Sequence, residues 1–448
     1  MERAPSTSRR WLVPALLALL TLYLLAARTF DTTSSFLLLR DQMRDWRIAL
    51  GPFSALPLTG PQSTAGGSSL GPVYYWVLWL SRLLLGPFTN NMPHAGAWGI
   101  ALLQTGADLA LILAVGRRTG TLLAGVAAVL LSSTSAHELA LSETIWNPAV
   151  SVAFVKYALA ARLHAGERAS LWATALTTAF AWFAVQAHSA SVFVAAPVVG
   201  SFVLQDVVLR EGRRALERTR AIVEVIVLLQ IPFLISLTTS TGEAVPTRAL
   251  AGAASGSIRW QASWVATLDF TSSILAKPWP FPGWPVLLPL GMGITAFVWR
   301  RSPSVLGCTV APMLLTVAGF ALWQGGYDEY WFLPLAPCAA LTLVLAVTAW
   351  QPRTMAAICI GLLAINQPAR LQASRAWYRM PEYRPIVLGA TRIVRQTKEL
   401  RRLDTAFRMP PFSDVGFPYE ILGGRFSPEA PFDAVINADG SVDFRPVR

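Results

Sequence analysis

Charged residues are scarce in this sequence. Asp, Glu, Lys and Arg together make up 14% of the 448 residues, whereas 54% are hydrophobic. A soluble globular protein carries about a quarter of its residues as charged side chains. The low charge and the mean hydropathy of +0.47 therefore exclude an ordinary soluble enzyme and indicate a protein that crosses a membrane several times.

Cysteine is also scarce. Cys308, Cys338 and Cys359 are the only three, and each lies in an apolar stretch. They are odd in number and lack the spacings typical of metal ligands. The sequence therefore predicts neither a disulfide framework nor a structural zinc site, and it contains no tandem repeat.

The charge that is present is mostly positive. The chain has 37 Lys and Arg against 25 Asp and Glu, a net charge of +12. A nucleic-acid-binding protein gathers such charge on one basic face. Here the basic residues form short clusters between apolar stretches and in the C-terminal tail, which is typical of membrane topology signals. We therefore expect no nucleic-acid partner.

The apolar stretches predict about eleven transmembrane helices. The predicted spans are Trp11–Ala27, Ala95–Val115, Leu122–Ser135, Pro148–Leu163, two within Leu171–Leu209 divided at His188–Ser191, Ile222–Leu237, Trp284–Trp299, Val305–Trp323, Trp331–Trp350 and Met355–Ile365. In this order every short basic cluster falls on the side of the N-terminus, which the positive-inside rule makes cytoplasmic. The stretch Thr238–Gly283 is then a long outer loop.

The first outer loop, residues 28–94, is rich in polar and aromatic residues. Gly and Pro residues between 51 and 72 predict a folded loop. The apolar run Val73–Leu85 has 13 residues, fewer than the roughly 20 that a span needs. It predicts a short interfacial or re-entrant helix, and we expect Phe36–Leu50 to lie along the same outer interface.

The predicted architecture is an all-α membrane domain over residues 1–366 and a small α+β extramembrane domain over residues 367–448. Within the second domain, Pro385–Leu403 has a helical pattern. The stretch VINADGSVDF predicts a hairpin that turns at Asp439–Gly440. A domain of this length can cross the membrane despite its positive charge, so we expect it outside.

The first outer loop contains the sequence DQMRD at residues 41–45. On a helix, Asp41, Arg44 and Asp45 have the spacing i, i+3, i+4 and point in one direction. Two Asp residues at i, i+4 repel each other slightly. Helix stability therefore does not account for them, and they are candidates for chemistry.

Four motifs carry a resemblance to a known family: DQMRD at 41–45, GPQSTAGGSSLGPVYYW at 60–76, SRLLLGP at 81–87 and WNP at 146–148. With the order of spans over residues 11–366, they resemble the bacterial GT-C membrane glycosyltransferases, which include protein O-mannosyltransferases and lipid A aminoarabinose transferases. That family usually has the motif D-E-x-R in this loop. Here Asp41 and Arg44 match and Gln42 replaces the Glu, so Asp45 is the nearest carboxylate that could substitute for it.

This resemblance implies an enzyme of the bacterial inner (plasma) membrane with its active site on the periplasmic or exterior side. Such an enzyme transfers a sugar, with inversion, from a polyprenyl-phosphate donor to an acceptor glycolipid, polysaccharide or protein. The acceptor hydroxyl needs a general base, for which a carboxylate in a partly dehydrated pocket is suited. The leaving phosphate needs cations, and Arg binds phosphate well.

The resemblance also implies individual roles. Asp41 is the expected base, Arg44 and Arg82 face the phosphate, and Tyr330, which precedes a Leu-Pro pair, donates a hydrogen bond; Tyr327 is the alternative. Two Arg residues can do for a monophosphate what a divalent metal does elsewhere. We therefore expect no metal and no other cofactor.

Other polar residues fall near the expected outer ends of spans. Glu143, Asn147 and His188 are expected to contact sugar. Asp108 lies within a span, one turn from Gln104. For Asp108 we expect bonding between helices instead of chemistry.

A purely structural role remains open for each of these residues. Asp41 and Asp45 could form the solvated face of an interfacial helix, paired with neighbouring Arg residues. Arg82 could extend to lipid headgroups, Tyr330 could belong to an interfacial aromatic belt, and His188 could be a buried structural histidine.

Two other classes of function also fit a polytopic chain. A transporter or flippase for lipid-linked oligosaccharides would have cationic surfaces on both sides of an inner cavity. A non-catalytic scaffold would leave the Asp41–Arg44 pair and the Gly-rich loop without a role. Because the ionisable residues concentrate on the outer side, the sequence favours one-sided chemistry.

Overall fold

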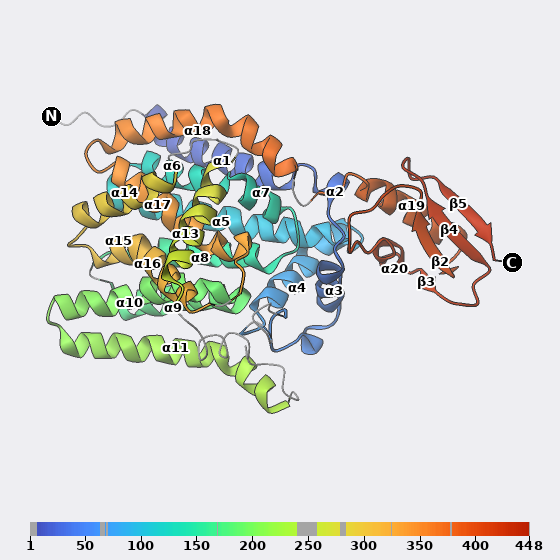
Figure 1. The fold of residues 1–448 in the computed structure, drawn as a ribbon, viewed down its shortest axis with the longest axis horizontal. Helices are drawn as coiled ribbons and strands as arrows, with labels where there is room; N and C mark the ends of the chain where they lie inside the picture. The colour runs from blue at the N-terminus through green and yellow to red at the C-terminus, as the bar shows by residue number, and fades with distance from the viewer. Residues whose placement is uncertain are drawn as a thin grey trace.

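A computed structural model describes residues 7–62, 68, 70–167, 169–239, 258–277, 284–323, 325–376 and 379–447. The molecule is elongated, with a bundle of helices at one end and a small α/β region at the other (Figure 1). The short helices α3 (Arg40–Leu50) and α4 (Val73–Leu85) lie where the two parts meet.

The bundle consists of helices that run back and forth along its length. They are α1 (Thr7–Thr29), α5 (His94–Thr119), α6 (Leu122–Ser133), α7 (Ala136–Ser142), α8 (Asn147–Ala165), α9 (Leu171–Ala187), α10 (Val192–Val208), α11 (Gly212–Thr239), α13 (Trp260–Ala276), α14 (Trp284–Val298), α15 (Pro303–Cys308), α16 (Val310–Ala321), α17 (Ala336–Val347) and α18 (Pro352–Arg375). Short elements connect them: α2 (Thr32–Ser35) and the 3-10 turns η1 (Phe53–Ala55), η2 (Gly86–Phe88), η3 (Ser189–Ser191) and η4 (Glu329–Leu335).

Among the described residues, six helices are long and apolar enough to cross a membrane. The number becomes seven if the bent pair α6 and α7 forms one broken span. Further apolar helices, Leu171–Ala187, Val286–Val298 and Val310–Ala321, have only 10–17 residues. The count of about eleven spans therefore stays a prediction.

Two predicted local features are confirmed. The short apolar helix has the predicted bounds, Val73–Leu85. The long apolar stretch after Leu171 is interrupted at residues 188–191, where η3 separates α9 from α10.

The prediction of a long outer loop at Thr238–Gly283 is wrong for residues Trp260–Ala276. Helix α13 lies within it and packs in the bundle, where Ser263 Oγ donates a hydrogen bond of 2.6 Å to the Val317 carbonyl. Its buried face contains Ser263, Thr267 and Thr271. These hydroxyls lower the apolar signal of the sequence, although the helix buries them. Residues 240–257 and 278–283 of this stretch lie outside the described residues.

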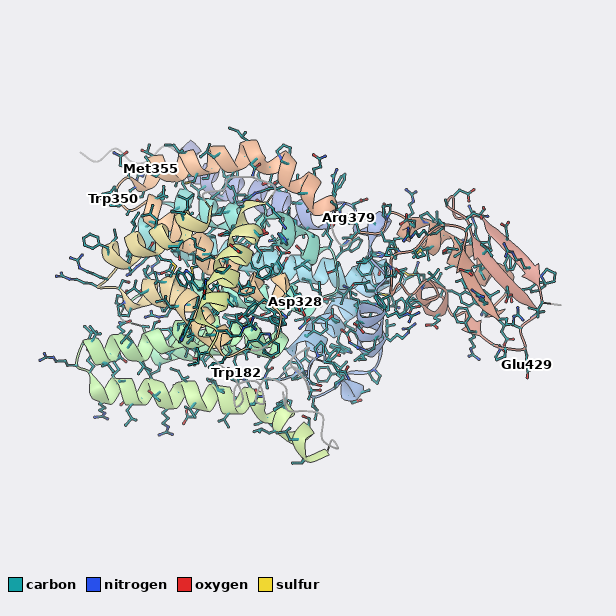
Figure 2. All side chains as sticks on the ribbon, viewed as in Figure 1. Trp182, Asp328, Trp350, Met355, Arg379 and Glu429 are labelled. Carbon is teal, nitrogen blue, oxygen red and sulfur yellow. The ribbon has the colours of Figure 1, made fainter. Side chains whose placement is uncertain are left out.

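The basic loops meet at one end of the bundle, as the sequence predicted. Arg118 Nη2 lies 2.7 Å from Glu167, and the Arg118 guanidinium lies 5.6 Å from the centre of the Trp299 ring. Arg214 donates a hydrogen bond of 2.9 Å to the Ala169 carbonyl. This end lies away from the C-terminal region, and Figure 2 labels Trp350 and Met355 there.

The chain bends by 71° between α6 and α7. Such a break leaves carbonyl groups without helical partners, and buried carbonyls need a donor. Arg370 of α18 is fully buried and supplies it, with hydrogen bonds of 3.1 and 3.2 Å to the carbonyls of Leu130 and Leu131. Its Nη2 donates to Leu275 of α13 at 2.6 Å. One arginine thus ties three segments together.

A fully buried cluster of charges joins α1, α5, α7 and α8. Asp108 accepts from Arg28 at 2.7 Å and pairs with Lys156 at 2.8 Å. Glu138 pairs with the same two cations. Two positive and two negative groups balance each other, which offsets the cost of burial. The expectation that Asp108 makes bonds between helices is confirmed.

The C-terminal region contains α19 (Tyr383–Gln396), α20 (Phe417–Ile421) and five strands: β1 (Glu399–Leu400), β2 (Arg402–Thr405), β3 (Arg425–Phe426), β4 (Phe432–Ile436) and β5 (Val442–Pro446). Strand β4 lies between β2, to which it is parallel, and β5, to which it is antiparallel. Gly440, in the turn between β4 and β5, has a φ of +78°, so the predicted hairpin is confirmed.

The predicted helix Pro385–Leu403 is correct only up to Gln396. Beyond it the chain forms β1 and β2, because these residues pair with β3 and β4, which lie far along the sequence. The proposed domain boundary at residue 366 lies inside α18, which continues to Arg375.

Candidate functional site

Helix α3 has one buried face and one solvated face. Gln42, Met43, Asp45, Trp46 and Ala49 are buried. The indole of Trp46 donates a hydrogen bond of 2.8 Å to the Asn91 carbonyl. A Cβ at Gly96 would lie 2.9 Å from the Trp46 ring, so only glycine allows this close packing. These contacts hold α3 against the start of α5.

Asp45 is the buried carboxylate of the DQMRD motif, and its Oδ1 atom is fully engaged. It accepts from Arg44 Nε at 3.0 Å, from Arg44 Nη2 at 2.9 Å and from the Tyr75 hydroxyl at 3.1 Å. Burial raises the pKa of Asp45, and the Arg44 guanidinium opposes that rise. The arrangement fixes the orientation of Arg44.

Asp41 lies on the solvated face of α3, with 86% of its side chain exposed. Its one described contact is the Arg44 guanidinium, 3.3 Å away. The expectation of a partly dehydrated pocket is therefore wrong for Asp41, and Asp45 has that environment. The reason is geometric. Met43 and Trp46 pack into the protein from the opposite face of α3, so Asp41 lies on the face that points to solvent. Asp41 remains open to a ligand.

Helix α4 connects α3 to the turn between α7 and α8. The Tyr74 hydroxyl donates to the Ile145 carbonyl at 3.2 Å, and the rings of Tyr74 and Tyr75 are 5.4 Å apart. The next residue in the turn, Trp146, has its ring 5.1 Å from that of Tyr330. A continuous path of contacts therefore runs from Asp45 to Tyr330.

His188 and Asn147 complete this second group. The ring of His188 lies 6.0 Å from that of Tyr330. The Asn147 amide donates to the Ala187 carbonyl, directly before His188, at 2.9 Å. We call Asp41, Arg44, Asp45 and Tyr75 the acidic half of the site, and Trp146, His188 and Tyr330 the aromatic half.

Two polar groups of the aromatic half have no hydrogen-bond partner among the described residues. The Tyr330 hydroxyl and the buried His188 Nε2 form no hydrogen bond with any residue in the described ranges. In contrast, the Tyr327 hydroxyl donates to the Phe320 carbonyl at 3.1 Å. Of the two tyrosines that the sequence indicated, Tyr330 is the better placed.

Arg82 is half-buried and lies two turns after Tyr75 on the same side of α4. Two helical turns correspond to about 10 Å along α4, and no contact between described residues joins Arg82 to Arg44. Within the part of the chain that the structure describes, Arg82 has no ion-pair partner.

Glu143 is buried in the turn after α7 and pairs with Arg379, whose guanidinium lies 2.5 Å from it. The same guanidinium pairs with Asp31 at 3.0 Å. Burial raises the pKa of Glu143 to about 7, although Arg379 opposes the rise. Glu143, which was expected to contact sugar, thus forms an ion pair with Arg379 of the C-terminal region.

Sequence reasoning missed Tyr75, Trp146 and Arg379 as members of the site or its support. Tyr75 and Trp146 lie within the motifs GPVYYW and WNP, so a signal was present. Arg379 is 236 residues from Glu143 and 348 from Asp31, and no local pattern indicates such pairs.

Glu329, next to Tyr330, is also held in place. It pairs with His137 of α7 at 2.8 Å and accepts from the Ser273 hydroxyl of α13 at 3.0 Å. These contacts position the η4 turn. In the described ranges no group of three or more His, Cys, Asp or Glu side chains is placed to hold a metal ion.

No protein-family model and no curated protein matches this sequence. Solved structures do resemble it. ArnT from Cupriavidus metallidurans in the apo state has a TM-score of 0.61 and 13% identity, over 93% of this chain and 85% of ArnT. The same protein bound to undecaprenyl phosphate gives a TM-score of 0.60 and 14% identity over the same shares.

The arabinofuranosyltransferase AftD from Mycobacteria also aligns, with 14% identity over 94% of this chain but 32% of its own length, at a TM-score of 0.44. The ArnT alignments each cover 93% of this chain. The chain therefore has a fold similar to that of the solved ArnT structures.

Proposed function

We propose that this protein is a glycosyltransferase that transfers a sugar from a polyprenyl-phosphate donor to an acceptor hydroxyl at the outer face of the membrane. The observation that carries the proposal is the acidic half of the site. It combines an accessible carboxylate, Asp41, with a guanidinium, Arg44, that a buried carboxylate holds in place. The ArnT fold and the undecaprenyl phosphate bound in one ArnT structure support the class of donor.

In the proposed reaction the acceptor oxygen attacks the anomeric carbon of the sugar, and the bond from that carbon to the phosphate oxygen breaks. Asp41 takes the proton of the acceptor hydroxyl as general base. The electron pair of the broken bond stays on the phosphate, whose growing charge is stabilised by Arg44. We propose Arg82, farther along α4, as the second cation for the phosphate.

The proposed role of the aromatic half is to bind sugar. Tyr330 offers a hydroxyl for a hydrogen bond to a sugar, and the rings of Trp146 and His188 lie beside it. Glu143 and Asn147 then act by supporting the turn that carries Trp146. We propose that Asp45 orients Arg44. The alternative is that Asp45 substitutes for the Glu of the D-E-x-R motif, whose position is occupied here by Gln42.

The test begins with the lipid fraction of cells that lack the protein. We expect a polyprenyl-phosphate sugar to accumulate, and the purified protein in bilayers should consume it with release of free polyprenyl phosphate. Asp41→Asn should abolish the release, whereas Asp404→Asn, an exposed position on β2, should not. A parent protein that leaves every accumulated lipid-linked sugar intact would overturn the proposal.

A further inference from the structure

Arg379 lies where the C-terminal region meets the bundle (Figure 2). Only 9% of its side chain is exposed, and it pairs with two carboxylates from distant parts of the chain, Asp31 and Glu143. Its backbone forms a β-bridge with Phe36. A buried guanidinium is costly unless it is paired, and removing it leaves its partners unpaired. This residue therefore joins three segments.

The segment that leads into α3 is held between two pieces of the C-terminal region. On one side, the Met380 amide donates to the Ser35 carbonyl at 2.8 Å. On the other, the Asp414 amide donates to Leu38 at 2.7 Å, and the Arg40 amide donates to Phe412 at 2.9 Å. Residues 36–39, between α2 and α3, thus form an extended strap, and backbone hydrogen bonds to the C-terminal region hold it along its length.

Helix α3 has a further bond to that region on its solvated face. Arg47 pairs with Asp414 at 3.0 Å and with Glu420 at 2.6 Å. Its guanidinium also lies 4.7 Å from the centre of the Phe417 ring. The helix that carries Asp41, Arg44 and Asp45 is therefore held by α4 and α5 from within and by the C-terminal region from outside.

Through Glu143, Arg379 also reaches the aromatic half. Glu143 lies two residues before Ile145, whose carbonyl accepts from Tyr74, and three residues before Trp146. A shift of this turn would move Trp146 relative to Tyr330. Arg379 thus contacts the supports of both halves of the site. It reaches the strap through Phe36, the residue before α2 through Asp31, and the turn after α7 through Glu143.

We infer that Arg379 is a positioning residue that sets the acidic and aromatic halves of the site relative to each other, so that the C-terminal region is an obligatory part of the transferase. The expected effect of Arg379 on activity rests on the proposed function. The expected effect of Arg379 on the structure of the two segments does not depend on that function.

The experiment compares Arg379→Ala and Arg379→Lys with Arg401→Ala in the full-length protein. Arg401 is an exposed arginine of the same region that pairs with Asp433 and is far from the site along the chain. Two quantities are measured: amide hydrogen exchange of residues 35–47 and 143–147, and kcat and KM for the polyprenyl-phosphate sugar. A small misplacement of reacting groups costs roughly 100-fold in rate.

For Arg379→Ala we expect faster exchange in both segments and a fall in kcat of roughly 10- to 100-fold, with donor KM within a factor of about 3 of the parent. Arg379→Lys should recover part of the loss, and Arg401→Ala should match the parent. Unchanged exchange with full transfer in Arg379→Ala would overturn the inference. Faster exchange in Arg379→Ala, in a preparation whose parent protein transfers no sugar, would support the positioning role and contradict the proposed function.

If Arg379→Ala does not fold, Glu143→Gln provides the same test. It keeps the shape of the side chain and removes one ion pair. We expect faster exchange at residues 143–147 and a smaller fall in kcat than for Arg379→Ala. Parent-like exchange and transfer in Glu143→Gln would overturn the link to the aromatic half.

Discussion

The Tyr75 hydroxyl donates to the same carboxylate oxygen of Asp45 that accepts both hydrogen bonds from Arg44. Three donors on one oxygen favour the ionised carboxylate, against the burial that raises the pKa of Asp45, and they occupy the atom that would have to take a proton from a substrate. Asp41, four residues earlier, has only one weak contact to the same Arg44. The two carboxylates of one motif therefore have different environments, and this difference suggests different roles.

Replacement of Asp41 by Asn tests the proposed base. An amide keeps the shape of the side chain but cannot take a proton, and loss of a general base costs about 10²–10⁴ in rate. Because Asp41 is exposed, stability should change by no more than about 0.5 kcal/mol. The measurement is sugar transfer in membranes at matched expression, with Asp404→Asn as the control. Transfer near the parent rate would show that Asp41 is not the base.

Replacement of Asp45 by Asn separates orientation from catalysis. If Asp45 only orients Arg44, the variant should lose less activity than Asp41→Asn, and the loss should include weaker donor binding. Tyr75→Phe removes one hydrogen bond to a carboxylate and should cost about 1.5–3 kcal/mol of stability with a minor effect on rate. Steady-state kinetics distinguish the cases. A loss in Asp45→Asn as large as in Asp41→Asn would mean that Asp45 replaces the carboxylate missing at Gln42.

The two proposed phosphate ligands can be tested by donor binding. Arg44→Ala and Arg82→Ala should each weaken binding of a polyprenyl-phosphate donor by about 1.5–3 kcal/mol, the usual value of a hydrogen bond to a charged group. Arg213→Ala, at an exposed position in the first turn of α11, is the control. Equal affinity in Arg44→Ala, Arg82→Ala and the parent would contradict both assignments. A loss at Arg44 alone would mean that Arg82 stays distant from the phosphate.

The buried charge cluster predicts a strong effect on stability. Asp108→Asn removes one of two carboxylates that balance Arg28 and Lys156. Breaking such a pair typically costs about 3–5 kcal/mol. We expect a lower unfolding temperature in detergent, whereas Asp439→Asn, an exposed position in the β4–β5 turn, should match the parent. An unfolding temperature equal to that of the parent would show that the cluster does not stabilise the fold.

Glu143 predicts a dependence of stability on pH. Its pKa in the folded protein is about 7, above the usual 4.5, so folding favours its protonated form. The corresponding stabilisation is complete below pH 4.5 and is lost as pH rises through 7. A shift of this size corresponds to about 3 kcal/mol. The unfolding midpoint, followed from pH 5 to 8, should fall less steeply for Glu143→Gln than for the parent. Parallel curves would contradict the raised pKa.

Local sequence determined several elements of this protein. The length and composition of Val73–Leu85 set a short helix, because a mostly apolar run of 13 residues is too short to cross a bilayer. Asp439–Gly440 set a hairpin, because glycine adopts the positive φ that its turn requires. The basic clusters indicated which loops would meet at one end, because each cluster is a short-range signal that lies between two spans.

Tertiary structure alone decided which carboxylate of DQMRD is buried, and it decided the place of α13 and the partners of Arg379. The exposure of Asp41 follows from the face of α3 on which Met43 and Trp46 pack, and Tyr75 reaches Asp45 from another helix. Arg379 finds its carboxylates 236 and 348 residues away. Such contacts depend on the packing of distant segments against each other, and neither local propensity nor hydrophobic period carries that information.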